Sequence, residues 1–133
     1  MAVIFSASTD AFSAPHTSRW IGPFLLWLWP SLSAGAVADL QFALRKAGHM
    51  LEYALLAILL WRALRRAGDE AWSWRAAAWA VSLAAAYAVT DEIHQSFTRL
   101  RQGSPWDVLI DVAGAALALL ALGWWRRRRQ RRD

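Results

Sequence analysis

The chain has 133 residues, of which 57% are apolar, with 10 Trp, no Cys and a formal net charge of +5. This composition excludes disordered, collagen-like and disulfide-bonded proteins, and the lack of Cys removes thiol catalysis and thiolate metal sites. The apolar fraction exceeds the roughly 45–50% of globular domains, and it gathers in long runs. The sequence therefore predicts a small all-α integral membrane protein that forms one domain over residues 1–133, and not a nucleic-acid-binding protein.

The N-terminal part is predicted to hold no complete membrane span. Residues 1–7 read like the end of an apolar segment, but they are too short to cross a bilayer and lack the basic start of a signal peptide. Either the protein has three spans with its N-terminus outside, or residues 1–7 are the remainder of a truncated first span. Residues 8–18 are polar and predict a loop. Residues 20–32 are interrupted by Pro23 and Pro30, which favours an interfacial or re-entrant helix.

Three later stretches are long and apolar enough to cross a hydrocarbon core, for which a helix needs about 20 residues. They cover residues 48–64, 74–93 and 105–125. Residues 36–46 carry apolar side chains at helical spacing and predict an amphipathic lead-in to the first span. The expected fold is thus a polytopic helical membrane protein with three full transmembrane helices.

The basic residues predict the orientation. Ten of the 15 fall on one side of the three spans: Arg62, Arg65, Arg66, Arg75, Arg126, Arg127, Arg128, Arg129, Arg131 and Arg132. The positive-inside rule places this side, with the C-terminus, in the cytoplasm. An inner aromatic belt is expected from Trp61, Trp72, Trp74, Trp124 and Trp125, with Trp106 at the outer edge. The arginine tail is interpreted as a topology anchor, with an anionic-lipid or nucleic-acid patch as the alternative.

Polar side chains concentrate at the outer ends of the predicted spans. An ionisable group at the centre of a span costs about 2.5–3.5 kcal/mol, so such groups indicate function. The candidates for one polar cluster are His49, Glu52, Asp91, Glu92, His94, Gln95, Arg101, Asp107 and Asp111. Three pairs share a helical face by their spacing: His49 and Glu52, Asp91 and His94, and Asp107 and Asp111, with Gln95 four residues after Asp91.

Some of these residues also fit simpler roles. Ser104-Pro105-Trp106-Asp107 has the pattern of a helix start, so Asp107 could serve only as a capping residue. One of the neighbours Asp91 and Glu92 is expected to be merely solvated, with Glu92 facing water or headgroups. His49 could be a packed histidine.

Two kinds of site remain open for the cluster. The favoured one is a metal-free network that binds a polar headgroup or relays protons, with Arg101 as a clamp for an anionic group. The alternative is a metal site whose ligands would be His49, Glu52, His94 and Asp111.

The stretches that carry the cluster resemble the VanZ-like family of small bacterial membrane proteins. Three motifs carry the resemblance: Lys-x-x-His-x-x-Glu-Tyr at Lys46, His49, Glu52 and Tyr53; Asp-Glu-x-His-Gln at Asp91, Glu92, His94 and Gln95; and an Arg followed by Asp-x-x-x-Asp-x-x-Gly at Arg101, Asp107, Asp111 and Gly114. It covers about residues 40–125. Residues 1–35 then hold the partial span, loop and interfacial segment, and residues 126–133 form a basic cytoplasmic tail.

The chain departs from the family pattern at two places. Thr98-Arg99-Leu100 stands where a Pro-Gly turn is usual, and Ile4-Phe5-Ser6 matches only the end of the family's first span. The resemblance implies an integral membrane protein, and the family's name member is associated with low-level teicoplanin resistance. It implies no reaction and no cofactor.

Three functions are consistent with these observations. The leading hypothesis is a protein that binds or handles a cell-envelope component, such as a lipid headgroup or a cell-wall precursor. The alternatives are a membrane-embedded metal-assisted hydrolase or transferase, and a structural subunit that binds a partner. The lipid bilayer is the expected surrounding, nucleic acid is not an expected partner, and the cofactor and oligomeric state are left open.

Overall fold

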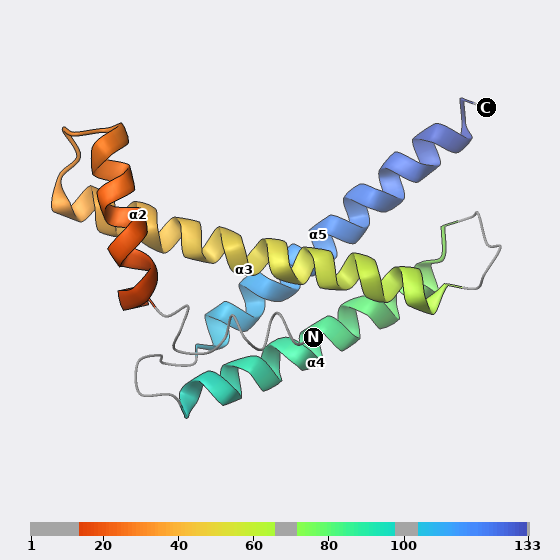
Figure 1. Cartoon of the computed structure of the whole chain (residues 1–133). Coiled ribbons are helices and arrows are strands. Elements are labelled where there is room, and N and C mark those ends of the chain that lie inside the picture. Colours follow the sequence, from red (N-terminus) through yellow and green to blue (C-terminus); the bar gives the residue numbers. More distant parts are fainter. Residues whose placement is uncertain (1–13, 66–71, 98–103, 133) are drawn as a thin grey trace.

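A computed structural model describes residues 14–65, 72–97 and 104–132. Over these ranges the chain forms four helices and no strand: α2 (Ala14–Leu28), α3 (Ala34–Leu64), α4 (Trp74–Ser96) and α5 (Pro105–Gln130) (Figure 1). The predicted all-α class is confirmed. The suggested truncated first span, residues 1–7, lies outside the described residues.

The helix α3 unites two elements that the sequence analysis separated. The amphipathic lead-in and the first predicted span form a single helix of 31 residues. Ser33 caps its start, because the Ser33 hydroxyl accepts a hydrogen bond of 3.2 Å from the Ala36 N–H. Gly48 is the first residue of the predicted span, and a glycine inside a helix costs only about 1 kcal/mol, which is too little to end it.

The helix α2 lies across the N-terminal part of α3 (Figure 1). It starts at Ala14, so the predicted loop over residues 8–18 is wrong for its last residues. Pro23 lies inside the helix, whereas the helix stops before Pro30, as expected because the residue before a proline disfavours the helical conformation. The interfacial or re-entrant position of this segment stays a prediction.

The helix α4 buries small side chains, and all three long helices expose large apolar ones. α4 buries alanines every fourth residue, at Ala76, Ala80, Ala84 and Ala88, while large apolar side chains such as Leu51, which is 70% exposed, point outward. A soluble domain hides its large apolar residues, so a surface of this kind indicates contact with an apolar medium.

Two of the helices, α3 and α5, are long and apolar enough to cross a membrane by length and composition, with mean hydropathies of 1.3 and 1.9 over a stretch of 18 residues. The third predicted span, α4, does not qualify by the same criteria. The expectation of three full transmembrane helices is therefore supported for two helices, and the third span remains a proposal.

The predicted inner aromatic belt includes one residue that belongs to the core. Trp61 is 1% exposed and stacks on Trp72, with ring centroids 4.9 Å apart, and Trp72 meets Trp74 edge-on at 5.6 Å. Trp61 therefore packs between helices and does not face the membrane interface, whereas Trp74, Trp124 and Trp125 are exposed.

Candidate functional site

Four carboxylates gather where the end of α4 and the start of α5 meet α3. Asp91 and Glu92 come from the last turns of α4, and Asp107 and Asp111 come from the first two turns of α5. Three of them are buried, with 5% of Asp91, 7% of Glu92 and 2% of Asp111 exposed. The antiparallel course of consecutive helices brings them together, because α5 begins near the place where α4 ends (Figure 1).

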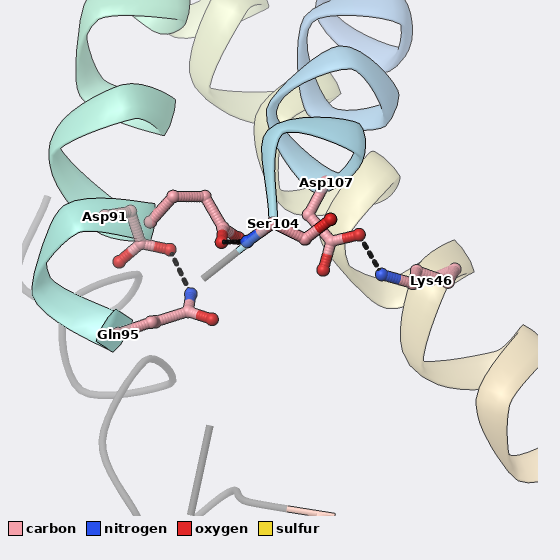
Figure 2. Close-up of polar contacts among 6 residues, drawn as sticks. Lys46, Asp91, Gln95, Ser104 and Asp107 are labelled. Carbon is pink, nitrogen blue, oxygen red and sulfur yellow. Dashed lines mark hydrogen bonds and ion pairs between the residues drawn. The ribbon is translucent and has the colours of Figure 1, made fainter. Parts of the chain in front are cut away.

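An ion pair joins α5 to α3 at this place. The Lys46 ammonium group binds the Asp107 carboxylate, and both side chains are partly buried (Figure 2). Lys46 also lies over the ring of Phe42, 5.2 Å from its centroid. Lys46 is the only lysine in the sequence. Asp107 therefore does more than begin a helix, since its carboxylate connects two helices.

Glu92 joins α4 to α5, contrary to the expectation that it faces water or headgroups. Its carboxylate accepts a hydrogen bond of 2.7 Å from the Ser104 N–H, at the N-cap of α5. The Ser104 hydroxyl makes no capping bond, and Glu92 satisfies the N–H of the N-cap residue itself from another helix. Asp91 is buried as well and accepts a bond of 2.8 Å from Gln95 Nε2 (Figure 2). Neither member of the pair is merely solvated, because each faces a different part of the helix interface.

We expect Glu92→Ala to lower the free energy of unfolding by about 1–2 kcal/mol, the usual cost of losing a helix N-cap. Glu92→Gln should lower it less, because the amide oxygen still accepts from the Ser104 N–H. The measurement is denaturant unfolding of the detergent-solubilised protein, followed by tryptophan fluorescence. Equal losses for the two variants would show that the negative charge matters and the capping bond does not.

Asp111 and Tyr53 carry polar atoms that the fold leaves unsatisfied. Asp111 Oδ1 and the Tyr53 hydroxyl are buried and have no hydrogen-bond partner in the described part of the chain. The two side chains interact electrostatically, and Tyr53 also interacts with Asp91. An unsatisfied buried polar group costs about 1–3 kcal/mol, so this place favours the binding of a polar group or a water molecule.

The charge of the site is unbalanced. Asp111 interacts electrostatically with Glu92, Asp107 and Asp91, and with a single basic group, the Lys46 ammonium. The predicted clamp residue Arg101 lies outside the described residues. Over the described ranges the site therefore presents four carboxylates against one lysine, an arrangement suited to groups that donate hydrogen bonds.

The histidines occupy the margin of this site. His49 Nδ1 lies 4.0 Å from Glu52 Oε2, on the face of α3 that their spacing predicted, and the Glu52 side chain is about one-third exposed. His94 is half-buried on α4. The described residues contain no group of three His, Asp or Glu side chains placed to hold a metal ion. His49, Glu52, His94 and Asp111, the candidate ligands, do not form such a group there.

Lys46 and Tyr53 belong to the site, although the sequence predicts neither as a member of the polar cluster. Lys46 ends the predicted amphipathic lead-in, and both residues belong to the first of the three family motifs. Two signals could have identified Lys46: it is the sole lysine among 15 basic residues, and it lies three residues before His49, on the same helical face.

The comparisons agree with the motifs. The model of a family described as VanZ/LLP1 matches residues 1–126. The match includes residues 1–39, which lie before the range over which the motifs were recognised. No curated protein matches the chain, and no solved structure matches it.

Proposed function

The chain belongs to the VanZ/LLP1 family, and we propose that it is a multi-pass protein of the bacterial inner membrane whose polar cluster faces outward and binds a cell-envelope component. The proposal has three parts: the third span, the orientation and the ligand. Each is supported by different residues.

The third span is supported by the packing of α4. From Ala76 to Ala88 its buried side is made of alanines, which let it lie close to α3 and α5. Its outer side carries Trp79, Leu83, Val89 and Ile93. Close packing through small residues with large apolar residues outside is typical of membrane helices. Such a helix would cross the membrane as part of the bundle even though its mean hydropathy is modest.

The orientation is supported by the position of the arginine tail. Arg126 lies over Trp61, 4.9 Å from the ring centroid, and Arg127 lies over Trp74 at 4.8 Å. The basic end of α5 is thus beside the end of α3 and the start of α4, opposite the polar cluster. By the positive-inside rule this basic end is cytoplasmic and the cluster is external.

The ligand is inferred from the unsatisfied atoms. Asp111 Oδ1 is the observation that carries the proposal, because a buried carboxylate oxygen without a donor is suited to an ammonium or hydroxyl group of a ligand. The Tyr53 hydroxyl could donate to an oxygen of the same ligand. Lipid headgroups and lipid-linked cell-wall precursors both carry such groups. A change in susceptibility to glycopeptides such as teicoplanin would follow if the ligand is a precursor.

We expect Asp111→Asn to weaken binding of phosphatidylethanolamine about tenfold or more, since hydrogen bonds to charged groups contribute about 1.5–3 kcal/mol. Native mass spectrometry of the purified chain, titrated with this lipid, measures the loss. Asp39→Asn is the matched control, because Asp39 is an exposed carboxylate on α3. Phosphatidylcholine, whose methylated ammonium donates no N–H bond, should bind weakly to all three proteins.

A second experiment tests whether the ligand is a cell-wall precursor. It measures the teicoplanin susceptibility of cells that express each variant. Equal lipid binding and equal susceptibility for the unmodified chain and Asp111→Asn would refute the proposal. If Asp111→Asn fails to accumulate in the membrane while Asp39→Asn accumulates normally, the result would favour the alternative that the polar cluster has a structural role.

A further inference from the structure

A cleft between α4 and α5 lies at the end of the bundle opposite the polar cluster. One part, of about 580 Å³, is bordered by Trp74 and Trp124 and by three arginines, Arg127, Arg128 and Arg131. A second part, of about 400 Å³, shares Trp74 and Leu120 with the first and is otherwise lined only by Ala, Val and Leu side chains. The cleft is thus cationic at one end and apolar at the other.

The arginines at the cleft are held by aromatic rings. Arg127 Cζ lies 4.8 Å from the ring centroid of Trp74, and Arg128 Cζ lies 3.8 Å from that of Trp124. A guanidinium group over an aromatic face keeps its N–H groups available at its edges for an anion. None of the three arginines forms an ion pair with a carboxylate in the ranges that the structure describes.

The rotation of α5 that turns these arginines toward the cleft is fixed by a close contact. Gly123 approaches Trp72 so closely that a Cβ atom at this position would lie 2.8 Å from Trp72 Cε2. Trp72 stacks on Trp61, whose ring also carries Arg126. Arg126 is therefore engaged with the core, whereas Arg127 and Arg131, spaced four residues apart, share the face that borders the cleft.

We propose that this cleft binds an anionic phospholipid, with its phosphate group on Arg127, Arg128 and Arg131 and an acyl chain in the apolar part. The charge at one end and the apolar lining at the other match the two ends of such a lipid. Basic pockets between membrane helices on the cytoplasmic side are suited to anionic headgroups. A nucleic acid or free phosphate would use the arginines and leave the apolar part without a partner. The proposal assigns part of the arginine tail a binding role in addition to its role in topology.

The test uses the purified full-length chain in detergent, with phosphatidylglycerol as the probe and phosphatidylcholine as the neutral comparison. Binding is measured by native mass spectrometry and by quenching of tryptophan fluorescence with brominated acyl chains. We expect the unmodified chain to prefer phosphatidylglycerol by about tenfold or more, and the triple variant Arg127→Gln, Arg128→Gln, Arg131→Gln to lose this preference. The control is Arg62→Gln, Arg75→Gln, Arg132→Gln, which removes the same charge at exposed positions outside the cleft.

A separate variant tests the acyl chain without changing the charge. Ala78→Trp would fill the apolar part, since Ala78 lines it and is exposed. It should reduce phosphatidylglycerol binding and the quenching by brominated chains. The proposal is overturned if the two triple variants lose phosphatidylglycerol binding equally, or if Ala78→Trp binds this lipid as the unmodified chain does. It is also overturned if inorganic phosphate or single-stranded RNA displaces the lipid as effectively as phosphatidylglycerol itself.

Discussion

Gly114→Ala is expected to lower the free energy of unfolding by about 3 kcal/mol, because the added methyl group would overpack the contact between α5 and α3. A Cβ atom at Gly114 would lie 2.7 Å from the Met50 carbonyl oxygen and 3.0 Å from Met50 Cα. Both atoms belong to the backbone of α3, which cannot move aside as a flexible side chain would. The two helices would have to separate, and the packing around Asp111, three residues before Gly114, would loosen with them.

Gly48→Ala is the matched control for this prediction. Gly48 is also inside a long helix, but a Cβ atom there would meet no atom within 4 Å. The substitution should leave stability unchanged or raise it by up to about 1 kcal/mol, because alanine is the better helix former. Denaturant unfolding in detergent, followed by tryptophan fluorescence, compares the two variants. Equal stabilities would mean that α3 and α5 do not approach each other at Gly114.

Lys46→Met is expected to lower the free energy of unfolding by about 2–3 kcal/mol. Breaking a buried ion pair costs about 3–5 kcal/mol, and the value here is smaller because both side chains keep some solvent contact. Without Lys46, Asp107 faces the other carboxylates of the cluster with no lysine beside it. Asp107→Asn should cost less, about 1 kcal/mol, because it removes one of the negative charges.

The double variant Lys46→Met, Asp107→Asn separates the pair from its surroundings. The two single substitutions each lower the free energy of unfolding. We expect the loss in the double variant to be about 1–2 kcal/mol smaller than the sum of the two single losses, as is usual for residues in contact. Arg45→Gln is the control, since Arg45 lies over the same Phe42 ring, 5.6 Å from its centroid, and has no role in the ion pair. Additive losses in the double variant would contradict a direct interaction between Lys46 and Asp107.

The sequence predicted the helices well where local signals are strong. The pattern Ser104-Pro105-Trp106-Asp107 predicts a helix start, and α5 begins at Pro105. The convergence of Asp91, Glu92, Asp107 and Asp111 could also be predicted, because it depends only on the antiparallel order of the helices. The merger of the lead-in with the first span could not be predicted in this way, because an amphipathic segment and an apolar span have the same helical spacing and no breaker separates them.

The contacts within the cluster depend on information that is not local. The Lys46–Asp107 pair requires the rotation of α5 against α3, and that rotation follows from the approach of Gly114 to Met50. The burial of Glu92 depends on the position of Ser104, at the start of α5, whose N–H lies beside its carboxylate. Neither fact is visible in the spacing of residues along a single helix, so the spacing identified the members of the cluster and not their partners.

The uninterrupted course of α3 has a consequence for the depth of the polar cluster. At about 1.5 Å per residue, its 31 residues extend about 46 Å, against about 30 Å for a hydrocarbon core. To fit the whole helix inside the hydrocarbon core by tilting alone, α3 would need an angle of about 50°, beyond the usual range of roughly 0–40°. Part of α3 must therefore project from the bilayer if it spans as proposed. Lys46 lies about 18 Å from the start of the helix, close to where the projecting part would end. A thicker or thinner bilayer would therefore move the Lys46–Asp107 pair across the boundary between lipid and water, which makes membrane thickness a variable that controls the hydration of the cluster.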